Sequence, residues 1–166
     1  MLLDLFNAYR ADAQHIASVF LALAIWRWGA GPERWLIAVF IATMVAPIQV
    51  IQFLGVNHPA VSGYSAFYAG IDVLAGFAFV AIALQANRNY PLWIAAFQLV
   101  AIASHGVKAV VDAVTPIAYA IMVVGPSYCQ LLLIFVGFVR HIQRTRRFGP
   151  YRDWRVVAAR DGWLNA

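Results

Sequence analysis

Residues 35–54 form a run of twenty amino acids without one charged side chain. A helix needs about 20 mostly apolar residues to cross the ~30 Å hydrocarbon core of a bilayer. Four more apolar stretches of comparable length occur in this chain of 166 residues, of which 63% are hydrophobic and 11% charged. A soluble domain of this size carries about 25% charged residues and has too little interior for so much apolar surface. The sequence therefore predicts an all-α, polytopic membrane helix bundle.

Charges, glycines and prolines divide the apolar part into five expected transmembrane helices. The expected spans are residues 11–28, 35–54, 65–85, 91–114 and 116–139, which together make one transmembrane domain over residues 1–139. The first span gives only about 27 Å of helix, so a half-inserted helix is the alternative there. Pro47 and Pro126 fall inside expected helices and should bend them; a gating hinge is the alternative at Pro126.

The net charge of +5 is concentrated in an arginine-rich tail, residues 140–166. The tail has seven arginines and two acids, whereas the rest of the chain has five bases and five acids. Because basic segments stay on the cytoplasmic side, the tail is expected in the cytoplasm and the N-terminus outside, as in a bacterial inner-membrane protein. Arg27, Arg34 and Arg88 then fall in cytoplasmic loops. Four tryptophans are expected near the cytoplasmic span ends: Trp26, Trp28, Trp35 and Trp93.

Aromatic and apolar residues of the tail share one arc if the tail is helical, with arginines beside that arc, which predicts a helix lying on anionic lipid headgroups. The expected lipid or partner contacts are Arg144, Arg147, Trp154 and Arg155. An extended segment is the alternative, and docking of a membrane-protein partner or a second copy is also open. Since the tail directly follows an apolar span, we expect no nucleic-acid partner.

Polar residues are expected to gather in the outer half of the bundle. Gln98, His105 and Asp112 are seven residues apart and so lie near one line of a helix, with Lys108 beside it. Because charges facing lipid are costly, this stripe should face inward and meet Asp72 of the neighbouring helix. We predict an Asp72–Lys108–Asp112 cluster with His105 hydrogen-bonded to Asp72. Three further polar residues complete the expected layer: Gln49, Gln52 and Tyr119.

Three histidines are expected on the same side and raise the question of a metal or haem. His15, His58 and His105, with Asp72, are residue types that bind zinc, and pairs of histidines bind haem iron. However, no two of them are three or four residues apart and the chain has no HExxH motif, so the cofactor stays undetermined. Cys129 lies in an apolar run and is expected to be a small core residue.

The sequence contains no motif that identifies a reaction, such as a phosphate-binding loop, GxGxxG, CxxC or GxSxG. We therefore expect a non-enzymatic binding or accessory subunit of a membrane complex, with an outward-facing polar pocket. The alternatives are a translocator of protons, ions or small solutes that uses the intramembrane Asp, His and Lys residues, an intramembrane enzyme with histidine-bound metal or haem, and a pore-forming lysis protein.

Overall fold

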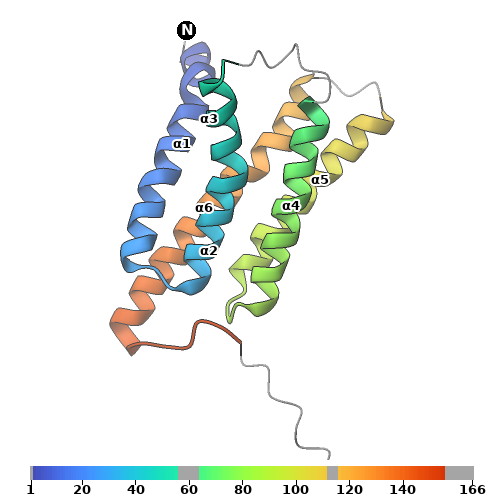
Figure 1. Cartoon of the computed structure of the whole chain (residues 1–166). Helices are drawn as coiled ribbons and strands as arrows, with labels where there is room; N and C mark the ends of the chain where they lie inside the picture. The colour runs from blue at the N-terminus through green and yellow to red at the C-terminus, as the bar shows by residue number, and fades with distance from the viewer. Residues whose placement is uncertain (1, 56–63, 112–115, 156–166) are drawn as a thin grey trace, which may run out of the picture.

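The computed structural model describes residues 2–55, 64–111 and 116–155, and this part of the chain is almost wholly helical. The elements in chain order are α1 (Leu2–Trp28), α2 (Gly31–Phe40), the π-helical turn η1 (Ile41–Val45), α3 (Ala46–Phe53), α4 (Tyr64–Gln85), α5 (Tyr90–Val110) and α6 (Pro116–Phe148). Because α2, η1 and α3 follow one another without a break, the described chain forms five helical rods (Figure 1). The predicted all-α bundle of five helices is confirmed.

Successive helices run in opposite directions, so the short connections gather at one end of the bundle (Figure 1). We call this the arginine end; it consists of residues 28–31 between α1 and α2, residues 85–90 between α4 and α5, and the last turns of α6, residues 140–148. α5 packs along both α4 and α6, and α1 packs mainly against α2. Four fully buried side chains form the centre of the core: Phe40, Phe79, Ile94 and Ile134.

Three of the described helices are long and apolar enough to cross a membrane, namely Gly31–Phe53, Ala66–Gln85 and Tyr90–Lys108. Many apolar side chains of these helices are exposed rather than buried in the core. Leu74 and Phe77 of α4, for example, are 68% and 73% exposed, whereas Asp72 on the same helix is 7% exposed. Polar groups inside and large apolar groups outside are the reverse of the pattern of a helix that packs on a core in water.

The helix that contains Pro47 changes its winding immediately before the proline. Pro47 has no N–H to donate to the residue four positions earlier, Thr43. The π-helical turn η1, a feature that inserts extra backbone into an α-helix, ends at Val45 and so accommodates this missing bond. The hydroxyl of Thr43 donates to the carbonyl of Val39 over 2.8 Å. Pro126, in contrast, lies within the unbroken helix α6.

Two helix ends differ from the sequence-based expectation. α5 ends at Val110, and Val111 is already extended with φ −118° and ψ 107°, so the expected helix to residue 114 is too long. α6 continues past the expected end at residue 139 and stops at Gly149, whose φ of +78° favours glycine. Residues 150–155, which we call the C-terminal segment, are not helical, so a helical tail is wrong for these residues.

Candidate functional site

A buried ion pair joins two connections at the arginine end. Glu33, in the first turn of α2, has no exposed surface, and the side chain of Arg88, between α4 and α5, is 8% exposed. The two side chains form an ion pair, and the hydroxyl of Tyr90 donates a hydrogen bond of 2.9 Å to Oε1 of Glu33. Charges this deeply buried are tolerated only with a partner, so Arg88 and Glu33 hold each other in place.

The C-terminal segment folds back onto this pair. Oδ1 of Asp153 lies 3.0 Å from Nη2 of Arg88, and Oδ2 accepts a 3.3 Å hydrogen bond from the amide of Gly31. The backbone also pairs with the α4–α5 connection, since Asn87 N donates to Asp153 O at 3.1 Å and Arg155 N donates to Gln85 O at 2.8 Å. The segment therefore fastens the two connections of the arginine end to each other.

A glycine makes room for the indole of this segment. A Cβ atom on Gly31 would lie 2.8 Å from Nε1 of Trp154. This distance is too short for a nonbonded contact, so a larger residue at position 31 would displace the indole. Trp154 is half-buried and packs against the core, whereas Arg155 is exposed. Trp154, one of the residues expected to contact lipid or a partner, thus packs against the helices of its own chain.

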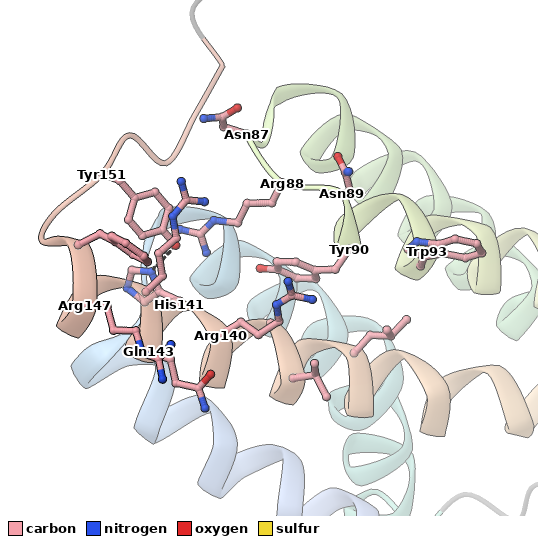
Figure 2. A pocket seen from close by; sticks show the side chains of 15 residues that line it. Asn87, Arg88, Asn89, Tyr90, Trp93, Arg140, His141, Gln143, Arg147 and Tyr151 are labelled. Atoms are coloured by element: carbon pink, nitrogen blue, oxygen red, sulfur yellow. Dashed lines mark hydrogen bonds between the residues drawn. The ribbon is translucent and has the colours of Figure 1, made fainter.

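His141 and Tyr151 extend the network toward solvent. Nδ1 of His141 lies 3.3 Å from Nη2 of Arg88 and 2.9 Å from the hydroxyl of Tyr151. Because an arginine only donates, Nδ1 is the acceptor in that contact. Burial, and next the nearby Arg88 charge, lower the pKa of His141, which the Asp153 carboxylate opposes. The guanidinium of Arg144 lies over the ring of Tyr151, 4.3 Å from its centre. Figure 2 shows the labelled side chains of Arg88, His141 and Tyr151 gathered at one point.

A half-open cavity of about 900 Å³ adjoins this network, between the α4–α5 connection, the start of α5 and the last turns of α6 (Figure 2). Its polar lining includes Asn87, Arg88, Asn89, Tyr90, Arg140, His141, Gln143, Arg144, Arg147 and Tyr151. Its apolar lining is Trp93, Leu133, Val136, Gly137 and Phe148. Of the residues that the structure describes, four arginines and no acid line it, so the cavity is suited to an anion.

A second buried polar group lies farther from the arginine end, between α4, α5 and α6. Oδ2 of Asp72 is 2.8 Å from Nε2 of His105, which is the hydrogen bond predicted from the sequence. Gln98 donates from Nε2 to Oδ1 and to the backbone carbonyl of Asp72, at 2.9 and 3.0 Å. Gln130 in turn donates to Oε1 of Gln98 at 2.8 Å. The chain of contacts therefore links three helices through side chains that are almost fully buried, apart from the partly buried His105.

Two other residues expected in the polar layer, Lys108 and Gln52, form no hydrogen bond or ion pair with Asp72 among the residues that the structure describes. Lys108 is exposed, and Asp72 pairs with His105, so the expected Asp72–Lys108 contact is wrong. Gln52 is also exposed. Asp112 and the side chain of Tyr119 lie outside what the structure describes. The polar cavity described above opens at the arginine end and is not lined by Asp72. The outward-facing pocket expected around Asp72 therefore stays a prediction.

Two of the three histidines considered as metal ligands have other partners in the described structure. Nδ1 of His15 lies 2.9 Å from Nε2 of Gln49, beside a mostly apolar cavity of about 340 Å³ between α1 and the η1–α3 region. His105 pairs with Asp72, and His58 lies outside the described residues. Over residues 2–55, 64–111 and 116–155, no three His, Cys, Asp or Glu side chains gather as a metal site would require.

Sequence reasoning missed the network around Arg88 because it used Arg88 only to set the topology and considered no partner for Glu33. One signal was available: Glu33 is an acid between the arginines expected at this end, which indicates a basic partner without identifying it. The acids at the arginine end, Glu33 and Asp153, are both paired with Arg88, which leaves the α6 arginines as the charges open to a ligand. This interpretation rests on geometry alone, since protein-family models, curated proteins and solved structures give no match to this chain.

Proposed function

We propose that this chain is an integral membrane protein with five membrane-crossing helices that serves as a binding or accessory subunit rather than as an enzyme. The observation that carries the proposal is the inverted distribution of side chains. Large apolar residues such as Leu74, Phe77 and Leu132 are more than half exposed, whereas Asp72, Gln98 and Gln130 are buried. Hydrocarbon around the helices makes this distribution favourable, and water makes it unfavourable.

The tryptophans support an orientation for the bundle. Trp26, Trp28, Trp35 and Trp93 are 61–66% exposed and flank the arginine end. Exposed tryptophans with arginines beyond them are typical of the cytoplasmic interface, where the indole rests among headgroups and the guanidinium reaches water. The arginine end is therefore proposed to face the cytoplasm, with the N-terminus on the other side.

Binding is favoured over translocation by the layer between the two polar groups. Ile94 and Ile134 have no exposed surface and separate the Gln98–Gln130 contact from the Glu33–Arg88–Tyr90 contacts along α5 and α6. A proton or solute path needs polar groups at every depth, and the buried side chains of Ile94 and Ile134 are apolar. The open basic cavity, in contrast, is a concave site in which four arginines converge, as a site for an anionic ligand requires.

Cysteine labelling tests the membrane location. In a Cys129→Ala background, Arg34→Cys is expected to react with a membrane-impermeant maleimide once the cytoplasmic face is accessible, whereas Leu74→Cys should stay unlabelled. Both native side chains are exposed in the isolated bundle, so only a surrounding bilayer separates them. Mass spectrometry of the single-cysteine proteins measures the labelled fraction. Equal labelling of the two positions in membranes would contradict the proposal.

The subunit role predicts an assembly larger than one chain of 18.3 kDa. Extracted from its native membrane in a mild detergent, the protein should migrate with a partner or a second copy, since the exposed apolar faces of α1 and α4 leave room for another helix pair. Native electrophoresis followed by mass spectrometry measures this. Migration only as a single chain in its detergent micelle would remove the accessory-subunit interpretation and leave a monomeric binding protein.

A further inference from the structure

We propose that the cavity at the arginine end binds one anionic phospholipid, with the phosphate held by Arg140, Arg144 and Arg147 and an acyl chain lying along Trp93 and Val136. The inference rests on the proposed membrane location, because the lipid enters from the surrounding bilayer. It assigns a defined site on α6, in place of a general attraction between a basic tail and the membrane surface.

The charge of the site requires an anion. Arg140, Arg144 and Arg147 follow one another at four and three residues, so they share one face of α6 and repel each other. All three are exposed, and none forms an ion pair with any residue that the structure describes. Glu33 and Asp153, the acids that the structure describes at this end of the bundle, are already paired with Arg88. A phosphate fits here because the planar guanidinium matches two of its oxygens at once.

The apolar lining identifies a lipid rather than a free phosphate. Leu133, Val136 and Gly137 lie on the same face of α6 as the arginines, one to two turns closer to the middle of the bundle. Trp93 of α5 borders the same surface and is 63% exposed. An arginine cluster continued by an apolar surface toward the membrane interior follows the shape of a phospholipid, whose charged headgroup is joined to its chains.

The helices α5 and α6 pack closely beneath the cavity. A Cβ atom on Gly137 would lie 2.6 Å from the ring of Tyr90, so the glycine lets α5 and α6 approach closely beneath the cavity. The Tyr90 ring is held in turn by its hydrogen bond to Glu33. The floor of the cavity is therefore fixed by the buried ion pair, and the arginines project from a rigid support.

The test uses the purified full-length protein in a neutral detergent, with short-chain phosphatidylglycerol as the probe and phosphatidylcholine of equal chain length as the comparison. Native mass spectrometry and thermal unfolding report binding. We expect phosphatidylglycerol to bind about tenfold more tightly, and the Arg140→Gln, Arg144→Gln, Arg147→Gln triple variant to lose about tenfold or more in affinity for it. The control triple variant Arg34→Gln, Arg146→Gln, Arg152→Gln removes the same charge from exposed arginines outside the cavity and should change the affinity less than about threefold.

Three outcomes would overturn the proposal. Equal loss in the two triple variants would mean general electrostatic attraction, and competition by inorganic phosphate at concentrations equal to the lipid would mean that the apolar lining contributes nothing. If the first triple variant does not fold, a photoactivatable phosphatidylglycerol on the unaltered protein decides; cross-links must fall within residues 87–93 or 133–148, and cross-links elsewhere overturn the site. The cysteine labelling is independent, so a failed lipid site leaves the membrane location intact.

Discussion

Arg88→Met is expected to lower the free energy of unfolding by about 3–5 kcal/mol, because it leaves the fully buried Glu33 carboxylate without its counter-charge. The same substitution removes the partner of Asp153, whose side chain is 32% exposed and therefore loses less. Chemical or thermal unfolding of the purified protein in mild detergent measures the change. Arg34→Met, an exposed arginine beside Glu33 in sequence, is the matched control and should shift stability by no more than about 0.5 kcal/mol.

A double variant separates the ion pair from simple loss of packing. Glu33→Gln together with Arg88→Met removes both charges but keeps an oxygen for the hydroxyl of Tyr90. Because the cost of Arg88→Met comes mainly from an unpaired buried charge, the double variant should be more stable than the single one. If the two substitutions instead add, or if Arg88→Met behaves like the Arg34 control, the buried pair does not hold the arginine end together.

Gln98→Leu is expected to lower the free energy of unfolding by about 2 kcal/mol. Leucine has a similar volume, so the substitution opens no cavity and isolates the hydrogen bonds. It takes from Asp72 a donor at 2.9 Å and from Gln130 an acceptor at 2.8 Å. Hydrogen bonds between membrane helices average only about 0.6 kcal/mol, but this one ends on a buried carboxylate, for which the loss is greater.

Gln85→Leu provides the control for this second prediction. Gln85 is on α4 like Asp72, but its side chain is exposed, and only its backbone carbonyl accepts from Arg155. Its substitution should leave unfolding in detergent nearly unchanged. If the Gln98→Leu protein is as stable as the Gln85→Leu protein, the hydrogen bonds of Gln98 to Asp72 and Gln130 do not contribute to the free energy of unfolding.

The hydrogen bond between Asp72 and His105 could be predicted because both residues lie within long apolar helices, where a polar group has few choices of direction. The same reasoning failed for Lys108, which belongs to the last turn of α5 and is exposed. A long side chain near a helix end carries its charge outward at little cost, so the position on the helical line did not decide its partner. The expected extension of α5 to residue 114 hid this, since it placed Lys108 a full turn deeper.

The contacts at the arginine end could not be predicted, because each joins segments that are remote in sequence. Arg88 comes from the α4–α5 connection and Glu33 from the first turn of α2, and neither has a periodic neighbour that would indicate an inward direction. The C-terminal segment carries a pattern compatible with a helix, but Asp153 and Trp154 are instead held extended by Arg88, Gly31 and the backbone of Gln85–Asn87. Tertiary contacts of this kind override local preference.

The place of Asp153 in the chain imposes an order on biosynthesis. Translation adds residues from the N-terminus, so the ribosome makes Asp153 65 residues after Arg88, when every helix that surrounds the guanidinium has already been polymerised. Until then, of the described carboxylates only Glu33 can pair with Arg88, and the C-terminal segment does not yet join the connections of the arginine end. The C-terminal segment can therefore join the connections of the arginine end only after α6 has been synthesised.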